Sequence, residues 1–167
     1  VRALFVQPNG SIVLGGLFTT ISSGASGPMA RHRLARLLPN GLLDSAFQPA
    51  CDGPVYSLAL QTNGKLVVAG AFTTLDSVAC SRIARLNTNG TRDTTFAGPS
   101  PIDDTVRSVA LQKDGCIVLG GDFISVGGVP RPYLPRLDND PASDVLSAPS
   151  ATSVLWLRSG ASPAISE

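Results

Sequence analysis

The sequence predicts an all-β protein, and two observations carry that prediction. The first is a stretch of thirteen residues that occurs three times, at 6–18, 60–72 and 111–123. The second is its pattern, an apolar run, a turn ending in Asn-Gly or Asp-Gly, and a second apolar run that closes in small residues and Phe. Because glycine supplies the positive φ that such a turn needs, each copy predicts a β-hairpin with Gly10, Gly64 or Gly115 in its turn. The chain is therefore an internal repeat.

Composition excludes several classes of protein. The chain has 167 residues, 43% hydrophobic and 15% charged, with a net charge of +1. So balanced a charge gives no electrostatic argument for a nucleic-acid partner. No apolar run approaches the roughly 20 residues of a membrane-spanning helix, so we expect no membrane insertion. The chain begins at Val1 rather than at Met, and we expect it to be a processed product or an excerpt of a longer protein.

The three cysteines leave their chemistry open. Cys51, Cys80 and Cys116 are an odd number and form no metal-type CxxC pair. One disulfide with a leftover thiol and three free thiols are equally compatible with the sequence.

Each repeat begins with a strand that is apolar on both alternating faces, at 1–7, 55–61 and 106–112. A strand wet on one side would alternate apolar with polar residues, so this sheet is expected to be covered on both faces. A segment of variable length follows the first hairpin, at 22–28, 76–79 and 127–130. Variation at one fixed place in a repeat indicates a surface loop, often on the binding face.

A second hairpin completes each unit, at 34–44 and 83–93. Four short strands and two tight turns in about fifty residues predict one four-stranded antiparallel blade of a β-propeller. The predicted blades are 1–54, 55–105 and 106–140. The third is degenerate in its outer hairpin, because Pro135 weakens the strand and Asp140-Pro141 replaces the expected Asn-Gly. Residues 141–167 are predicted to form an Ala/Ser/Pro-rich linker and a single strand at 152–158.

An Arg and an Asp recur eight residues apart in the second hairpin, as Arg36 with Asp44, Arg85 with Asp93 and Arg136 with Asp144. A three-residue turn ending in Gly41 or Gly90 places the first two pairs directly opposite each other. The third pair forms only if the Pro141 turn keeps its length. A charge pair in every blade favours a structural role over a site, since a catalytic site normally breaks the symmetry of a repeat.

One Phe ends the second strand of each repeat, and these residues are Phe18, Phe72 and Phe123. We expect all three to be buried at equivalent places between blades.

Few residues suggest chemistry. Arg31, His32 and Arg33 form a basic cluster in repeat one that could contact an anionic glycan or partner, although a satisfied surface His is the commoner case. Asp52, Asp103 and Asp104 lie in the links between blades without a calcium-loop pattern. Gly15-Gly16 and Gly120-Gly121 precede Phe rather than a phosphate-loop Lys, which favours close backbone packing. The sequence predicts no catalytic residue, no cofactor and no metal.

The two hairpin patterns together resemble the bacterial delta-sixty β-propeller repeat, over roughly residues 1–140. Repeat two, 55–96, matches almost throughout, and repeat three matches through Phe123 and again at Arg136. The resemblance implies a large protein that is secreted or displayed on the bacterial surface, and it implies no catalytic residues. It also implies that residues 153–167 are the start of an appended β-domain.

We therefore expect a non-enzymatic extracellular module of a surface, adhesive or fibre-forming protein. Three blades cannot close a propeller of the usual four to eight, so further blades or other copies of the chain are the expected partners, as a homo-oligomer or filament. The alternative is a glycan- or small-ligand-binding propeller that uses the variable loops, and a propeller-type lyase or hydrolase comes third.

Overall fold

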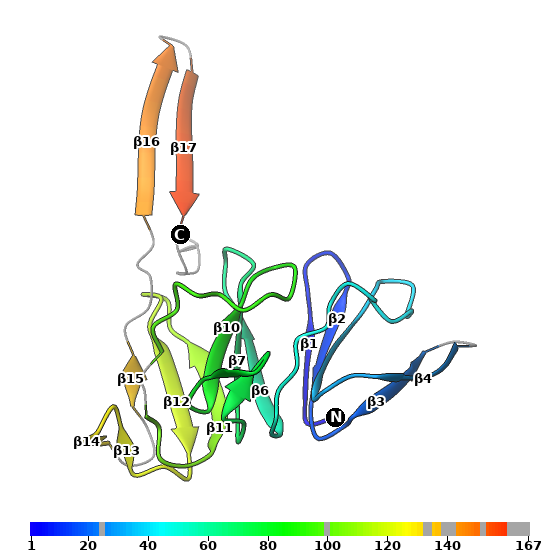
Figure 1. Ribbon diagram of the computed structural model, residues 1–167. Coiled ribbons are helices and arrows are strands. Elements are labelled where there is room, and N and C mark those ends of the chain that lie inside the picture. The colour runs from blue at the N-terminus through cyan, green and yellow to red at the C-terminus, as the bar shows by residue number, and fades with distance from the viewer. Residues whose placement is uncertain (24–25, 99–100, 132–134, 138–142, 151–152, 160–167) are drawn as a thin grey trace.

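The computed structural model describes the chain except residues 24–25, 99–100, 132–134, 138–142, 151–152 and 160–167 (Figure 1). Every regular element in the described part is a β-strand, and all strand pairs are antiparallel. The predicted all-β class is confirmed.

Three sheets of three strands stand side by side, with blade 2 between blades 1 and 3 (Figure 1). The second strand of each repeat is the central strand of its sheet. The strands are β1 (Ala3–Val6), β2 (Ile12–Gly15) and β5 (Leu34–Leu37) in blade 1, β6 (Val55–Leu60), β7 (Leu66–Gly70) and β10 (Ile83–Leu86) in blade 2, and β11 (Val106–Leu111), β12 (Ile117–Gly121) and β15 (Arg136–Leu137) in blade 3.

The prediction of a full fourth strand in each blade is wrong, because this strand is shorter than expected. In blades 1 and 2 it is reduced to an isolated bridge, Leu37 to Leu43 and Leu86 to Arg92. The following aspartate explains the early end, because one oxygen of its own carboxylate accepts the amide hydrogen two residues on. Asp44 Oδ1 lies 2.9 Å from the Ala46 nitrogen, and Asp93 Oδ1 lies 3.0 Å from that of Thr95. Such a turn competes with the sheet ladder.

Both hairpin turns have the predicted three-residue form. In the outer turn of blade 1, the Leu38 amide donates to the Leu42 carbonyl and the Gly41 amide donates to the Leu38 carbonyl, each at 2.8 Å. The five turn glycines all have φ between +80° and +91°. The preceding Asn or Asp accepts the amide hydrogen two residues on in every turn, at 3.0–3.1 Å, which explains why Asn-Gly and Asp-Gly recur. The residue pairs are Asn9 with Ser11, Asn40 with Leu42, Asn63 with Lys65, Asn89 with Thr91 and Asp114 with Cys116.

The variable segments are two-stranded ribbons rather than irregular loops, which corrects the expectation. In blades 2 and 3 the two linking residues, Asp76-Ser77 and Gly127-Gly128, all have positive φ, as a type I′ turn requires. The ribbons are β3 (Thr20–Ser23) with β4 (Ser26–Ala30), β8 (Thr74–Leu75) with β9 (Val78–Ala79), and β13 (Ser125–Val126) with β14 (Val129–Pro130).

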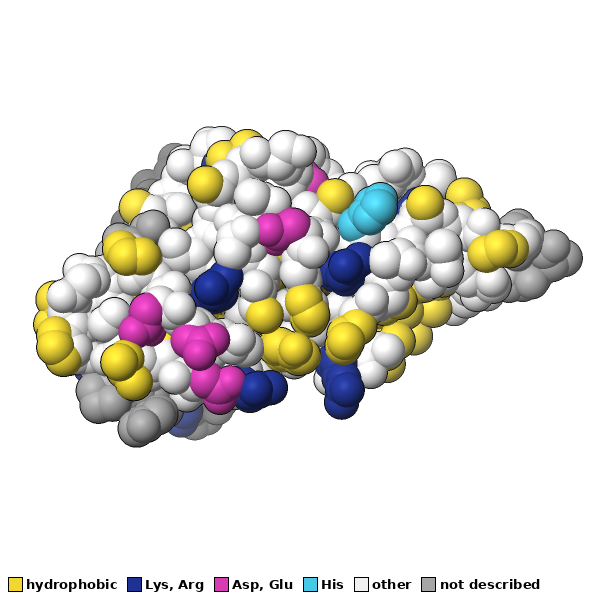
Figure 2. Space-filling view, turned by 60° about the horizontal axis from the view of Figure 1, so that its bottom comes forward, with side chains coloured by type: hydrophobic (Ala, Val, Ile, Leu, Met, Phe, Trp, Pro, Cys, Tyr) yellow, Lys and Arg dark blue, Asp and Glu magenta, His cyan; other side chains and the backbone are white. Residues whose placement is uncertain are grey.

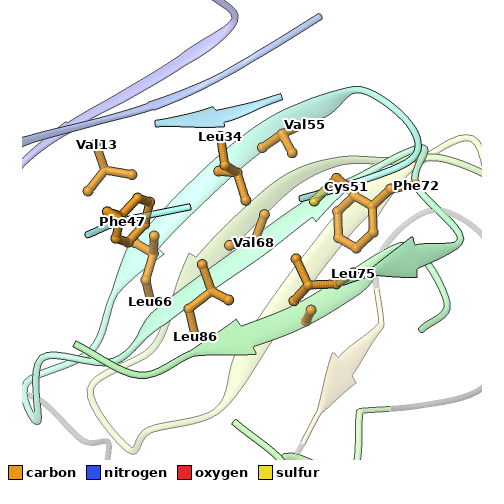
Figure 3. Packing of buried hydrophobic residues seen from close by; sticks show 11 residues of the cluster. Val13, Leu34, Phe47, Cys51, Val55, Leu66, Val68, Phe72, Leu75 and Leu86 are labelled. Carbon is orange, nitrogen blue, oxygen red and sulfur yellow. The ribbon is translucent and has the colours of Figure 1, made fainter. Parts of the chain in front are cut away.

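Two apolar cores lie between the blades, and the second repeats the first. The core between blades 1 and 2 is shown in Figure 3. Its Leu66, Val68 and Phe72 have counterparts in Ile117, Leu119 and Phe123 of the core between blades 2 and 3. The buried residues of the core between blades 1 and 2 are Val13, Leu34, Phe47, Cys51, Val55, Leu66, Val68, Phe72, Leu75, Ala84 and Leu86. The sheet of blade 2 is thus covered on both faces, whereas the sheets of blades 1 and 3 are covered on the face toward blade 2.

The aromatic prediction holds for two of its three residues. Phe72 and Phe123 are completely buried, each in one of the two cores. Phe18 is only half-buried. Its counterparts face the preceding blade, and no described blade covers that face of blade 1.

The paired glycines at the end of the second strands allow one backbone to cross another. A Cβ on Gly16 would lie 2.9 Å from Val1 Cα, and a Cβ on Gly121 would lie 2.1 Å from the Thr105 carbonyl oxygen. Gly70 holds the same place in blade 2, where a Cβ would lie 2.0 Å from the Pro54 carbonyl oxygen. The link that enters each blade therefore passes directly over these positions, and the expectation of close backbone packing is confirmed.

The C-terminal segment differs from the prediction. Residues interpreted as a linker form β16 (Ser143–Ser150), which pairs with β17 (Ser153–Ser159). The predicted single strand therefore has a partner that precedes it in sequence. This hairpin is a separate sheet that extends away from the blades (Figure 1).

None of the three cysteines forms a disulfide, and Cys51 and Cys116 are buried while Cys80 is half-buried. Burial raises the pKa of Cys80 to about 11. No helix among the described residues has the length and apolar character needed to cross a membrane.

Candidate functional site

The most distinctive polar feature is an ion pair that occurs in blades 1 and 2. In blade 1, Arg36 Nε lies 2.8 Å from Asp44 Oδ2, and Arg36 Nη2 lies 2.7 Å from the same oxygen. In blade 2, Arg85 Nε lies 2.7 Å from Asp93 Oδ2. The backbone register is the predicted one, because the amide of each Asp donates to the carbonyl of its Arg at 2.8 Å. Both expected ion pairs are confirmed as contacts.

Each guanidinium also lies over an aromatic ring of its own repeat. The Arg36 carbon Cζ is 4.6 Å from the centre of the Phe47 ring, and that of Arg85 is 4.9 Å from the centre of the Phe96 ring. Cation–π contacts at this distance are favourable. We call the Arg, the Asp eight residues on and the Phe eleven residues on the Arg-Asp-Phe unit of a blade.

The Arg-Asp-Phe unit of blade 1 reaches into blade 2. Arg36 Nη1 donates to the Thr88 carbonyl at 2.7 Å, and Thr88 lies in the outer turn of blade 2. In the same turn a Cβ on Gly90 would lie 2.6 Å from Phe47 Cδ2. The Phe47 ring therefore packs directly on Gly90 of the next blade. Gly90 both forms the turn and leaves the space for this ring, and we call this place on the outer turn the seat.

Blade 2 has the more buried version of the unit. Arg85 is 1% exposed and Asp93 4%. Lys65 Nζ adds a second cation 2.8 Å from Asp93 Oδ2, where the other repeats carry Ser11 and Cys116. The unit of blade 1 is more exposed to solvent, since Arg36 is only half-buried.

The carboxylates are held in their charged form. Burial raises the pKa of Asp44, but the hydrogen bonds from Arg36 and the Ala46 amide outweigh it and the pKa is lowered. Burial likewise acts upward on Asp93, and the hydrogen bonds from Lys65 and Thr95 bring its pKa well below the usual range. A pair of permanently charged groups suits a fixed contact better than proton transfer.

Arg136 and Asp144 lie in different sheets, so the backbone register on which the third pair depended is absent. Arg136 contacts the carboxylate of Asp114 instead, and both side chains are more than half exposed. Asp144 lies on β16, where its backbone partner is Arg158. The expected hairpin is replaced because the chain continues into the β16–β17 sheet, as the loss of the Asn-Gly turn at Pro141 suggested.

The basic cluster of repeat one does not form a joint surface. Arg31 is 6% exposed and donates to the carbonyls of Ala30 at 2.7 Å and Asp44 at 3.2 Å. His32 is exposed. Arg33 is half-buried at a φ of +70°, and Arg82 holds the same place in blade 2 at +65°, so this part of the cluster belongs to the repeat. On the face in Figure 2, basic and acidic side chains are interspersed.

The acids of the links have structural partners. Asp52 Oδ1 accepts the amides of Thr73 at 2.8 Å and Thr74 at 2.9 Å, and Asp103 Oδ1 accepts those of Ile124 and Ser125, each at 3.1 Å. Each Asp thus ties an inter-blade link to the next blade. Within the described ranges no three His, Cys, Asp or Glu side chains gather to hold a metal ion.

Sequence reasoning missed a glutamine at the foot of the first hairpin. Gln61 is 2% exposed, and neither its Oε1 nor its Nε2 has a hydrogen-bond partner. It borders a groove of about 420 Å³ between the turns of blades 1 and 2, lined also by Gln7, Arg36 and Thr88. The signal was available, because Gln precedes the turn in all three copies, at 7, 61 and 112.

One face of blade 1 exposes residues whose counterparts in blades 2 and 3 are partly buried. Leu4 and Val6 on β1 are 60% and 57% exposed. Their counterparts Leu58 and Leu60 pack against the core between blades 1 and 2, and Val109 and Leu111 pack against the next core. We call this side of blade 1 the open face.

The fold and the repeated unit define a β-propeller repeat protein, and the described residues form separate sheets that do not close into a ring. A family model described as domain of unknown function (DUF5122) beta-propeller matches residues 7–47, 61–96 and 112–140. The chain belongs to this family. Neither the curated proteins nor the solved structures contain a match.

Proposed function

We propose that the chain is a non-enzymatic structural and interaction module of a secreted or surface-displayed bacterial protein, of the delta-sixty repeat type. In this proposal the module serves adhesion or fibre formation. Further propeller blades, or other copies of the chain, cover its exposed blade faces and so build a larger assembly.

The open face of blade 1 carries the proposal. Its residues are of the kind that the two cores bury, and adjacent exposed Leu and Val side chains on a sheet are typical of an interaction surface. The location outside the cell is supported by the sequence resemblance to secreted repeat proteins. The non-enzymatic role is supported by polar groups that repeat from blade to blade and contact one another.

Hydrogen exchange of β1 tests the proposal. The chain is compared, over a wide range of concentrations, with a version extended by a second copy of residues 1–54 placed before Val1. We expect the amides of β1 to become protected in the extended chain or as the concentration of the chain rises. Equal exchange of β1 in every condition would show that the open face is not an assembly surface.

A second candidate is binding of a small polar ligand, and the unpaired amide of Gln61 favours it. A buried amide without partners costs free energy that a ligand with both a donor and an acceptor would recover. Screening a glycan array with the chain and with Gln61→Leu tests this candidate. A hit that Gln61→Leu leaves unchanged would count against the groove as the site.

A further inference from the structure

The contact between blades 1 and 2 has a specific polar and aromatic component besides its apolar core. Phe47 occupies the space above Gly90, and Arg36 donates to the carbonyl of Thr88 in the same turn. The outer turn of blade 2 thus acts as a seat for the Arg-Asp-Phe unit of the preceding blade.

The same seat exists on blade 1 and is empty. Gly41 is the counterpart of Gly90 and has nearly the same φ, +82° against +91°. A Cβ on Gly41 would meet nothing within 4 Å, whereas one on Gly90 would strike the Phe47 ring. The Pro39 carbonyl is the counterpart of that of Thr88. The counterparts of this seat and of Leu4 and Val6 in blade 2 all face blade 1. The seat therefore belongs to the same side of blade 1 as the exposed side chains of Leu4 and Val6.

The third blade of a second copy lacks the group that this seat fits. Counting eleven residues from Arg136 reaches Ser147 instead of Phe, and that residue lies on β16, outside blade 3. Arg136 itself contacts Asp114 within its own blade. Blades 1 and 2 do carry the complete unit, but the side of each blade that carries it already packs against the next blade of the same chain.

From this geometry we propose that the open face of blade 1 binds a blade of this repeat family that carries a complete Arg-Asp-Phe unit and that is none of the three described here. Its Phe sits on Gly41 and its Arg donates to the Pro39 carbonyl. The inference rests on the proposed function and names the partner of the same face. It excludes head-to-tail contact of two copies through blade 3.

The test uses the extended chain described above, in which the added unit carries its own Arg-Asp-Phe unit. The link is natural, because Pro54 of the added unit precedes Val1 as it precedes Val55 in the chain. Leu4→Cys in the original blade 1 reports on the open face, and its alkylation is followed on its own peptide by mass spectrometry. We expect alkylation at position 4 to be at least about tenfold slower in the extended chain than in the unextended chain, since a buried thiol is inert.

Two further variants test the seat. Replacing the Phe and the Arg of the added unit by Ala, or replacing Gly41 in the original blade 1 by Asn, should restore fast alkylation. Asn tolerates positive φ, so Gly41→Asn fills the seat while keeping the turn. Gly127→Asn is the matched control, because Gly127 also has positive φ and open space around it but lies in the ribbon of blade 3. It should leave position 4 protected.

Each other outcome overturns the inference. Protection that survives both seat variants would mean that the apolar face alone binds a blade, and the proposed function would stand without this partner. Protection in the unextended chain that grows with concentration would make a second copy the partner, again leaving the proposed function intact. Absence of protection in the extended chain, or an added unit that stays unfolded by hydrogen exchange, would overturn the inference. It would overturn the proposed function as well if rising concentration of the unextended chain also gave no protection.

Discussion

The carboxylate of Asp93 accepts hydrogen bonds from three side chains and one amide. Arg85 and Lys65 share its Oδ2, and the amide and hydroxyl of Thr95 share its Oδ1. One residue thereby neutralises a buried guanidinium and ends the outer strand of the blade. The ion pair between Arg107 and Asp122 is at least as well formed, with bonds of 2.6–3.0 Å, but both of its side chains are exposed.

Asp93→Ala should therefore lower the free energy of unfolding by about 3–5 kcal/mol, because the Arg85 guanidinium stays buried without its carboxylate. Asp122→Ala is the control and should change stability little, since water replaces the lost partner. Urea denaturation of both variants measures the difference. Equal losses would show that burial does not set the strength of these pairs.

Asp52 makes stability depend on acid pH. Burial acts to raise its pKa, but the hydrogen bonds from Thr73 and Thr74 lower it to about 2 from an ordinary 3.8. The unfolded chain then binds the proton more readily than the folded chain, so the stabilisation is present above about pH 4 and is lost as the pH falls toward about 2. Asp52→Asn keeps an oxygen that accepts the two amides but does not titrate there. Its unfolding free energy should fall less steeply over this range, and an unchanged slope would contradict the assignment.

At the scale of the element, Phe18 and Phe72 form a matched pair with the same place in the repeat and different surroundings. Phe72 is completely buried between two blades, and Phe18 faces the uncovered side of blade 1. Phe72→Ala should cost about 3–5 kcal/mol, as for other large aromatic residues in cores. Phe18→Ala should cost clearly less in the same denaturation experiment. A similar cost would mean that the strand end, rather than the neighbouring blade, determines the role of this Phe.

The hairpins were predictable because their information is local. A turn glycine and the alternation of apolar residues fix the register, and from the register follow the contacts of Arg36 with Asp44 and of Arg85 with Asp93. The short fourth strand was not predictable in this way, because the sequence shows the charges of Asp44 and Asp93 but not the direction of their second carboxylate oxygen. Their second oxygen binds a backbone amide and turns the chain away. The burial of Arg31 was also missed, since it depends on a carbonyl thirteen residues away.

The ribbon turns show a signal that could have been used. Gly127-Gly128 is a strong indication of a type I′ hairpin. Asp76-Ser77 adopts the same sign of φ at greater steric cost, and the hydrogen bond that Asp76 Oδ1 accepts from the Ala50 amide, at 2.8 Å, holds it there. That contact joins residues 26 apart, and no local pattern reveals it.

For the whole molecule, stability should be distributed unevenly. Blade 2 has a neighbour on both sides, whereas blades 1 and 3 each have one among the described residues. In a repeat protein stability is roughly a sum over units and their interfaces, so the end units open more easily. Native-state hydrogen exchange of the chain should therefore find the slowest amides in β7, and faster exchange in β1 and β15. Uniform exchange across the three blades would indicate a single cooperative unit.

The likeness of the two inter-blade cores has a consequence for how such a gene can change. Each interface joins one side of a unit to the opposite side of the next, with counterparts such as Val68 and Leu119 filling the same place. A tandem duplication of about fifty codons within blades 1 and 2 would insert a unit that fits both of its neighbours. Loss of a unit would rejoin matching sides in the same way. The length of the array can thus vary by recombination between repeats without any compensating substitution at an interface.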